Sequence, residues 1–220
     1  MSKKSKNSDP FASREAANYD RPVPSREFVL DYLRESAGPV THEEICVALN
    51  LNDEEQIEAM RRRLRAMERD GQVARNRRGG YGTLDKLNLI KGRVIGHPEG
   101  YGFVHPVDSD GQDIYLSSSQ MRRVFDGDIV LVRIAGWDRR GRPEGSLVDV
   151  VERNTVQVVG RYFRESGINF VRADNPRISQ DILIPADRQG EAKAGQIVVV
   201  DIIEPPSRNS LPVGHITEVL

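Results

Sequence analysis

The C-terminal part of the chain contains an internal repeat with an offset of 68 residues. The matching pairs are Gly92-Arg93 with Gly160-Arg161, Asp113-Ile114 with Asp181-Ile182, and Gly127 with Gly195. Similarity at a fixed offset predicts two copies of one structural unit. Each copy consists of short runs rich in valine, isoleucine and aromatic residues between glycine and aspartate turns, which is typical of strands. The repeat therefore predicts two small β-barrels of the same kind, over residues 86–152 and 153–220.

The first copy carries a Gly-Tyr-Gly-Phe-Val run at positions 100–104, and Tyr115 lies on the strand that follows. Tyr101 and Phe103 are two residues apart, so on a strand they point to the same face. Three rings on neighbouring strands form a platform on which unpaired bases can stack, at roughly 1–3 kcal/mol per base. The alternative is that the rings fill the barrel core. We favour the platform, because six aliphatic residues are available for that core: Val94, Val104, Ile114, Leu116, Val130 and Val132.

The second copy keeps only part of this aromatic set. Ile168 stands where the first copy has Tyr101, and Leu183 stands where it has Tyr115. Phe170 is the one ring of the three that remains, although Tyr162 and Phe163 add aromatic residues on an earlier strand. We therefore expect the second barrel to stack bases weakly, and to guide the RNA backbone or support the first barrel.

Basic side chains beside these strands are candidate contacts to RNA phosphates. In the first copy they are Lys91, Arg93 and His105, and in the second copy they are Arg161, Arg164 and Arg172. The whole chain has a net charge of −1, so its overall charge does not indicate a polyanionic partner. Local groups of basic side chains decide whether phosphate is bound.

Residues 24–85 have the pattern of three helices followed by a hairpin. The run 41–44 is a capping-box pattern, which opens a helix. The last helix carries an apolar stripe of Ile57, Met60, Leu64 and Met67. The run 77–80, Arg-Arg-Gly-Gly, predicts a hairpin turn. This order is typical of a winged helix-turn-helix, whose last helix and wing usually approach nucleic acid.

The exposed basic residues of this domain are its candidate nucleic-acid contacts. They are Arg61, Arg62, Arg63 and Arg65 on the last helix, and Arg77 and Arg78 at the tip of the wing. The alternative is a solvated charged face, which is what most charge runs are. We favour binding, because both elements that would touch phosphate are basic.

The remaining features of the sequence bear on the cellular compartment of the protein. Residues 1–23 are polar and contain lysines, and they predict a flexible basic tail. No apolar run has the length of a membrane span, and the single cysteine, Cys46, excludes an internal disulfide. We therefore expect a cytoplasmic protein with no membrane partner.

No metal ligand and no catalytic residue is assigned in this chain. Asp108, Asp110 and Asp113 are close in sequence, but the first two lie in a predicted turn and the third begins a strand. His42 and His97 have no companion ligands nearby and are expected to be surface side chains. We therefore expect no cofactor and no cleavage of RNA by these 220 residues.

The barrel motifs resemble those of a cold-shock domain, a small barrel of the OB class. The matching runs are 91–94 (Lys-Gly-Arg-Val), 100–104, 113–116 (Asp-Ile-Tyr-Leu) and 127–130 (Gly-Asp-Ile-Val). Together with the arginine run 61–71 and the run 159–163 (Val-Gly-Arg-Tyr-Phe), the order of domains is similar to the N-terminal region of bacterial ribonuclease R, in the ribonuclease II family. The resemblance covers about residues 22–220.

This resemblance implies an α+β multidomain fold, with an N-terminal winged helix-turn-helix followed by two small OB-type, cold-shock-like β-barrels. The family it names consists of processive 3′→5′ exoribonucleases that use divalent metal, so Mg²⁺ is expected in a catalytic domain beyond residue 220. The chain would then capture single-stranded or structured RNA and guide it to that domain. The ribosome or other RNA-decay proteins are further candidate partners, through the winged helix.

Two other functions are compatible with the same domains. The first is a stand-alone RNA chaperone of the cold-shock type. The second is a DNA-binding regulator built on the winged helix, and two RNA-type barrels count against it.

Overall fold

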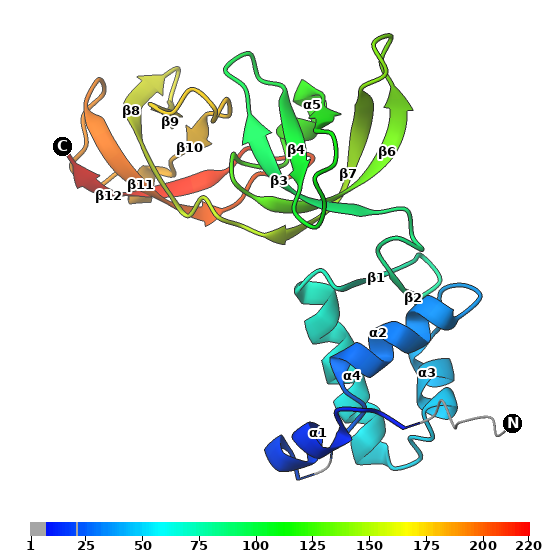
Figure 1. Cartoon of the computed structure of the whole chain (residues 1–220). Coiled ribbons are helices and arrows are strands. Elements are labelled where there is room, and N and C mark those ends of the chain that lie inside the picture. Colours follow the sequence, from blue (N-terminus) through cyan, green and yellow to red (C-terminus); the bar gives the residue numbers. More distant parts are fainter. Residues whose placement is uncertain (1–7, 21) are drawn as a thin grey trace, which may run out of the picture. The chain divides into compact units, whose positions relative to one another are not determined.

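The computed structural model describes residues 8–20 and 22–220. The chain divides into two compact units, and the boundary in the sequence lies between Leu89 and Ile90. Helices dominate the N-terminal unit and strands dominate the C-terminal unit (Figure 1). Within the described ranges, no helix combines the length and the apolarity that a membrane span requires.

The N-terminal unit contains a winged helix-turn-helix, as the sequence predicts. Its helices are α1 (Ala12–Asn18), α2 (Arg26–Glu35), α3 (His42–Ala48) and α4 (Glu54–Arg69). The hairpin of β1 (Val73–Arg75) and β2 (Tyr81–Thr83) follows and forms the wing, and Val40 adds an isolated bridge to Tyr81.

Side-chain caps fix where three of these helices begin. Thr41 and Glu44 form the predicted capping box at α3, each side chain accepting a backbone N–H of the other residue. Ser25 and Asp53 accept backbone N–H groups in the first turns of α2 and α4. Each cap satisfies donors that a helix start leaves unpaired, and it contributes about 1 kcal/mol.

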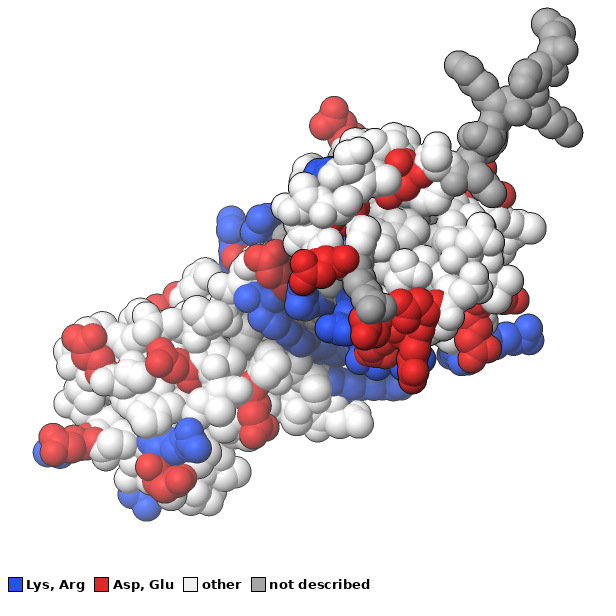
Figure 2. Space-filling view, turned by 90° about the horizontal axis from the view of Figure 1, so that it is seen from below, with Lys and Arg blue, Asp and Glu red and all other residues white. Residues whose placement is uncertain are grey.

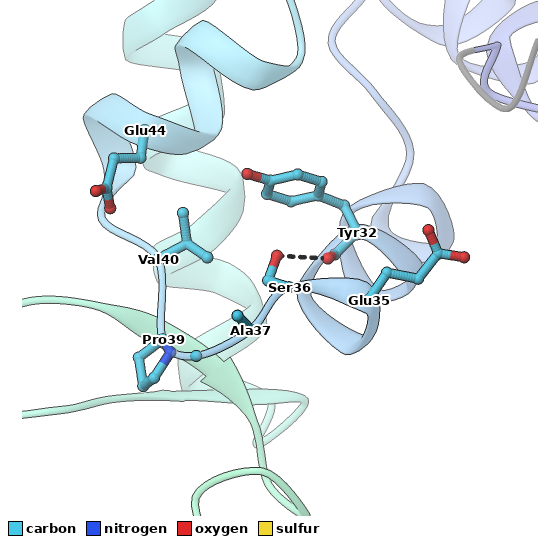
Figure 3. Close-up of a pocket in the computed structure, with 8 residues that line it drawn as sticks. Tyr32, Glu35, Ser36, Ala37, Pro39, Val40 and Glu44 are labelled. Carbon is cyan, nitrogen blue, oxygen red and sulfur yellow. Dashed lines mark hydrogen bonds between the residues drawn. The ribbon is translucent and has the colours of Figure 1, made fainter.

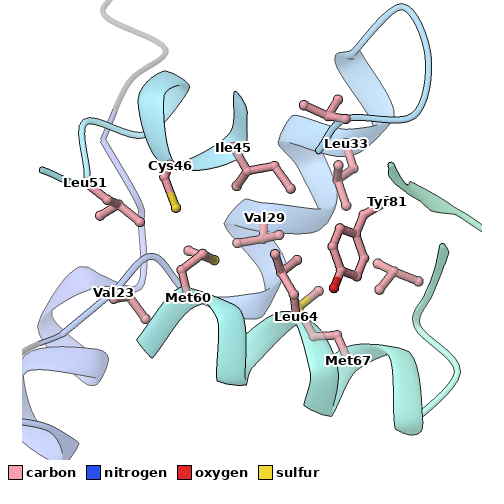
Figure 4. Packing of buried hydrophobic residues seen from close by; sticks show 12 residues of the cluster. Val23, Val29, Leu33, Ile45, Cys46, Leu51, Met60, Leu64, Met67 and Tyr81 are labelled. Atoms are coloured by element: carbon pink, nitrogen blue, oxygen red, sulfur yellow. The ribbon is translucent and has the colours of Figure 1, made fainter. Parts of the chain in front are cut away.

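The apolar faces of these helices meet in one core (Figure 4). Met60, Leu64 and Met67 of the predicted α4 stripe are completely buried, and Tyr81 packs against them from the wing. Full burial of such a side chain contributes roughly 1.5–3 kcal/mol. The stripe therefore fixes the rotation of α4 about its axis and leaves the opposite face of the helix exposed.

The segment before α2 differs from the flexible tail expected over residues 1–23. Residues 1–7 lie outside the described part, whereas residues 12–18 form α1. Asp9 accepts the backbone N–H of Ser25 at 2.5 Å and its hydroxyl at 2.8 Å. Glu15 is buried. Polar contacts of this kind leave no apolar periodicity in the sequence, so the pattern did not reveal the helix.

The C-terminal unit consists of two closed five-stranded barrels, as predicted. The strands of the first are β3 (Ile90–Gly96), β4 (Gly102–Pro106), β5 (Ile114–Leu116), β6 (Ile129–Trp137) and β7 (Pro143–Glu152), with the short helix α5 (Ser118–Met121) after β5. The strands of the second are β8 (Gln157–Glu165), β9 (Ile168–Ala173), β10 (Ile182–Leu183), β11 (Ile197–Glu204) and β12 (Val213–Val219), with the short helix η1 (Ala186–Arg188) after β10. The strand orders are β3-β4-β5-β7-β6 and β10-β12-β11-β8-β9, which are equivalent arrangements.

The interior of the first barrel is aliphatic. All six residues that the sequence offers for this core belong to one buried cluster: Val94, Val104, Ile114, Leu116, Val130 and Val132. Met121, Val124 and Leu147 complete it. The three predicted platform rings are not among its members. Aliphatic side chains therefore fill this barrel, and the rings stay on its outer face.

The internal repeat extends to individual contacts. A Cβ atom on Gly92 or on Gly160 would collide with a backbone carbonyl of the neighbouring strand, so glycine is required at both positions. Arg93 donates a hydrogen bond to the carbonyl of Gly127 at 3.2 Å, and Arg161 donates the equivalent bond to Gly195 at 2.6 Å. Both copies therefore keep the close packing of neighbouring strands at this glycine. Both also keep the hydrogen bond by which an arginine holds the turn before the fourth strand.

The two barrels are joined through a shared core and a buried polar network. Phe125, from the segment after α5, is buried in the core cluster of the second barrel. Gln180 of the second barrel donates to the carbonyls of Met121 and Val124, at 2.7 Å each. Asp128 is completely buried.

The carboxylate of Asp128 links the network to both barrels. It accepts hydrogen bonds from the backbone of Phe125 at 2.9 Å, the backbone of Asn154 at 3.1 Å and the guanidinium of Arg153 at 3.0 Å. Arg153 also donates to the carbonyl of Pro206 in the second barrel at 3.3 Å. The fully buried carboxylate of Asp128 is tolerated here because these donors satisfy its hydrogen-bonding capacity and Arg153 balances its charge.

We predict that Asp128→Asn lowers the free energy of unfolding of the C-terminal unit by about 2–4 kcal/mol, because the half-buried Arg153 loses the buried carboxylate that balances its charge. Urea denaturation followed by circular dichroism measures the change. The matched control is Asp138→Asn, since Asp138 also accepts bonds from an arginine and from backbone N–H groups but lies in a surface turn. Equal shifts in the two variants would contradict a special role for Asp128.

Candidate nucleic-acid interface

The three predicted rings of the first barrel lie together on its outer face. Phe103 on β4 is the strand partner of Tyr115 on β5, and Tyr101 immediately precedes β4. The ring centroids are 5.8 Å apart for Tyr101 and Phe103, 5.7 Å for Tyr101 and Tyr115, and 6.0 Å for Phe103 and Tyr115. All three side chains are half-buried. Each ring is thus partly open to solvent, whereas rings that filled the barrel core would be fully buried.

A fourth ring extends this group. His97 stacks on Tyr101 with centroids 4.2 Å apart and an interplanar angle of 13°. The backbone N–H of His97 donates to the carbonyl of Tyr101 at 2.9 Å, and Gly100 takes a positive φ of 90° in the turn between them. The sequence reasoning placed His97 at the surface without a role. Recognising 97–101 as a hairpin turn closed across its ends would have brought the two rings together. We call His97, Tyr101, Phe103 and Tyr115 the aromatic platform.

Basic side chains near the platform already have partners within the barrel. His105 contacts Asp113, with 2.7 Å between Nδ1 and Oδ1, and both side chains are about half exposed. Arg93 is engaged with Gly127, as described above. Lys91 lies on β3, opposite Leu131 of β6. If His105 or Arg93 binds an RNA phosphate, that contact replaces or adds to its hydrogen bond with Asp113 or Gly127.

The second barrel carries a different aromatic pair. Phe170 on β9 is nine-tenths buried and stacks on Phe163 of β8, with centroids 5.4 Å apart and an interplanar angle of 17°. Ile168, at the position of Tyr101 in the repeat, is exposed. Tyr162, next to Phe163, lies in the core and donates its hydroxyl to Gln189. The loss of two rings is thus partly offset by Phe163, one of the two added aromatic residues noted in the sequence.

The predicted basic residues of the second barrel have different surroundings. Arg172 pairs with Asp181 at 3.2 Å and lies over both phenylalanine rings, 5.2 Å from the centroid of Phe163 and 5.8 Å from that of Phe170. Hydrogen bonding to Asp181 raises the pKa of Arg172. Arg161 bonds to Gly195, and Arg164 is exposed on β8.

Five of the six predicted arginines of the winged helix are exposed. They are Arg61, Arg62 and Arg65 on α4, and Arg77 and Arg78 in the turn between β1 and β2. Arg61 pairs with Glu58 at 3.1 Å, an exposed pair one helical turn apart. On the face shown in Figure 2, basic side chains gather in patches next to acidic ones, and neither sign covers the surface.

The prediction that Arg63 is an exposed nucleic-acid contact is wrong, because the residue forms an internal ion pair. Its side chain is only 11% exposed, and its Nη2 lies 2.6 Å from the Oε2 of buried Glu15. Nη1 donates to the carbonyls of Val23 and Pro24, and the guanidinium lies 5.6 Å from the ring centroid of Tyr19. The arginine run predicted that Arg63 is exposed for nucleic-acid contact. Glu15, Tyr19, Val23 and Pro24 instead surround its guanidinium.

A second ion pair holds α1 in place. Arg14 donates to both carboxylate oxygens of Glu27 on α2, at 3.0 and 2.8 Å. These hydrogen bonds lower the pKa of Glu27 to about 2 and raise the pKa of Arg14. The pair lies at the surface, so it adds less to stability than the buried contact of Glu15 with Arg63.

Comparison with known proteins finds the same relatives along almost the whole chain. Residues 27–90 match the family described as "Ribonuclease R winged-helix domain", residues 92–150 match "Ribonuclease B OB domain", and residues 170–220 match "Cold shock domain". Ribonuclease R of Escherichia coli is 49% identical over 212 residues, covering 96% of this chain and 26% of that protein. The chain corresponds to the N-terminal region of ribonuclease R. Ribonuclease R of Acidithiobacillus ferrooxidans is 44% identical over 215 residues, covering 96% of this chain and 48% of that protein.

The chain therefore spans about a quarter of the length of the Escherichia coli relative, in its N-terminal region. Among solved structures, ribonuclease R of Mycoplasma genitalium in its apo form matches with a TM-score of 0.52 and 20% identity, over 60% of this chain and 21% of that one. The same enzyme has been solved in complex with ribose methylated single-stranded RNA. Yeast Ssd1, a pseudonuclease, matches with a TM-score of 0.53 and 15% identity, over 62% of this chain and 23% of that one. At these identities the structures support the fold alone.

A cavity of about 610 Å³ in the N-terminal unit lies between the end of α2 and the start of α3 (Figure 3). Tyr32, Ser36, Pro39 and Glu44 are among its lining residues. The carboxylate of Glu44 is used in the capping box, where the N–H of Thr41 lowers the pKa of Glu44. We assign no ligand to this cavity.

The residues with potential chemistry are engaged in packing. In the part of the chain that the structure describes, no three His, Cys, Asp or Glu side chains are grouped so that they could hold a metal ion. Cys46 lies 3.5 Å from the Nε2 of His42, which in turn lies 3.0 Å from the carbonyl of Ile57. Burial raises the pKa of the Cys46 thiol. A raised pKa disfavours the thiolate, so this pair is not arranged as a nucleophile with its base.

We predict that Glu15→Gln loosens α1 without unfolding α2 to α4, because Arg63 loses its buried counter-charge. Amide hydrogen exchange in α1 should accelerate about tenfold or more, which corresponds to a loss of about 1.4 kcal/mol of local stability.

The matched control is Glu58→Gln, which removes the exposed partner of Arg61 and should leave exchange in α1 unchanged. Unchanged exchange in the Glu15 variant would show that α1 is held by its other contacts.

Proposed function

We propose that this chain is the RNA-binding region of a ribonuclease R-type 3′→5′ exoribonuclease, and that the aromatic platform holds single-stranded RNA. The observation that carries the proposal is the grouping of four rings on the outer face of the first barrel, outside an aliphatic core. The identity to ribonuclease R relatives supports it. So does the solved complex of the Mycoplasma genitalium enzyme with single-stranded RNA.

Stacking suits an enzyme that must accept any RNA sequence. Every base has a π-face, so an aromatic surface binds unpaired bases without reading their hydrogen-bonding edges. Duplex RNA hides these faces, which makes the platform selective for unpaired strands. Lys91, Arg93 and His105 lie on the two strands β3 and β4 and supply a salt-dependent contact to the phosphates.

In this proposal the winged helix contacts structured RNA. Arg62 and Arg65 on α4, with Arg77 and Arg78 on the wing, are exposed and basic, as phosphate contacts need to be. Arg61 joins them if phosphate replaces Glu58. The ribosome and other RNA-decay proteins are further partners proposed for this domain.

Hydrolysis is proposed to take place outside these 220 residues. The Escherichia coli relative extends over a much longer chain, of which this one covers 26%. There, Mg²⁺ held by carboxylates would polarise the phosphodiester and activate water. The role proposed for the present chain is to capture RNA and guide its 3′ end to the catalytic domain. We propose that this RNA degradation takes place in the cytoplasm.

The experiment that tests this function removes two platform rings. Tyr101→Ala with Tyr115→Ala should weaken binding of a fluorescent oligouridylate at least about 30-fold, because each stacked base contributes roughly 1–3 kcal/mol. Fluorescence anisotropy at one fixed salt concentration measures the affinity, since salt alone changes it strongly.

The matched control is Trp137→Ala, which removes an exposed ring of the same barrel on β6 and should leave the affinity unchanged. Equal affinity of the double variant and the unmodified chain, with both folded by circular dichroism, would mean that charge alone binds the RNA.

A further inference from the structure

The second barrel has rebuilt an aromatic pair in a new place. In the first barrel, Ile95 on β3 is the strand partner of Phe103 on β4. In the second barrel, Phe163 on β8 is the partner of Phe170 on β9. The aliphatic member of the first pair is thus an aromatic ring in the second. Phe163 is half-buried and therefore offers part of its ring to solvent.

A restrained cation lies over this pair. The guanidinium of Arg172 is within 6 Å of both ring centroids, at the distances of a cation–π contact. The Nε of Arg172 donates to Asp181 Oδ1 at 3.2 Å, and its Nη2 donates to Oδ2 at 3.5 Å. The side chains of Arg172 and Asp181 are 61% and 36% exposed, so solvent and ligands reach the pair.

The first barrel has an equivalent pair at the same place in its repeat. His105 and Asp113 correspond to Arg172 and Asp181, and they pair at 2.7 Å. In both copies, a basic side chain is held by the aspartate that immediately precedes the neighbouring strand. A carboxylate beside a nucleic-acid surface repels phosphate, so its presence in both copies requires an explanation.

Phosphate is a better partner for this guanidinium than the aspartate. Exposed ion pairs contribute little to stability, because water competes for both groups. A phosphate accepts two parallel N–H bonds from arginine, and binding it also releases counterions from the RNA. When Arg172 turns toward a phosphate, it uncovers the face of Phe163 that its guanidinium had occupied.

We propose that the second barrel carries its own stacking site for single-stranded RNA, in which a base replaces the Arg172 guanidinium on Phe163 while an RNA phosphate replaces Asp181 as the partner of Arg172. The inference rests on the proposed function of the chain in RNA binding. It adds Phe163 to the RNA contacts and gives Asp181 the role of a competitor that weakens the site and eases release of the strand.

The test is a set of variants of the full chain, with binding of a fluorescent oligouridylate measured at low and fixed salt. Asp181→Asn should bind about twofold to fivefold more tightly, because the competitor of phosphate is lost. Phe163→Leu should bind about fivefold or more weakly, because one base loses its ring. Arg172→Gln should bind more weakly, and Asp181→Asn added to it should give no gain.

The matched control is Asp201→Asn, which changes the net charge equally. Asp201 accepts a hydrogen bond from Gln157 at 2.9 Å, at the opposite end of β8 from Phe163. An equal gain from Asp201→Asn, or a gain from Asp181→Asn that persists in the Arg172 variant, would reduce the effect to net charge and overturn the proposal.

The double variant of Tyr101 and Tyr115 separates the two proposals. If it weakens binding while Phe163→Leu and Asp181→Asn change nothing in folded protein, the proposed function stands and the second site is rejected. If it and the second-barrel variants all leave the affinity unchanged, both proposals are rejected. Should Phe163→Leu fail to fold, the two exposed variants, Asp181→Asn and Arg172→Gln, decide the matter alone.

Discussion

Strand alternation in the first barrel determines which side chains remain available for binding. Successive residues on a strand point to opposite faces, so filling the interior with Val94, Val104 and Ile114 requires Phe103 and Tyr115 to point outward. A shift of one residue in the pairing of β4 would exchange the two sets. The glycines at positions 92 and 102 oppose such a shift, because a side chain at either would collide with its neighbours. The register of β4 with its neighbouring strands therefore determines both the packing of the core and the exposure of the aromatic platform.

The second barrel shows how this scaffold changes while its core is preserved. Val198, Val200 and Ile182 fill the interior, and the contacts of Arg161 repeat those of Arg93. The outer face is free of this packing constraint and has diverged, with loss of two rings and gain of Phe163. Because Phe125 and Asp128 join the barrels, both outer faces belong to one folded unit. In the proposed function, a strand of RNA bound by one barrel would be presented to the other at a fixed spacing along the protein.

Much of this architecture could be predicted from sequence, since it depends on periodic patterns. The capping box at Thr41, the apolar stripe of α4 and the offset of the repeat each specify a local structure that the fold retains. The platform rings were predicted from their spacing. His97 was missed because its stacking on Tyr101 results from a hairpin turn and has no periodicity. Arg63 and α1 were misread because one buried carboxylate, Glu15, decides both, and a charged residue in a polar segment gives no sign that it is buried.

The central claim is that unpaired RNA lies on the aromatic platform of the first barrel. Photo-cross-linking with a thiouridine-containing oligonucleotide, followed by mass spectrometry of the cross-linked peptides, locates the bases on the chain directly. We expect cross-links within residues 97–103 and at Tyr115, and we expect excess unlabelled single-stranded RNA to abolish them. Cross-links confined to α4 and the wing, with none between residues 97 and 115, would contradict the account.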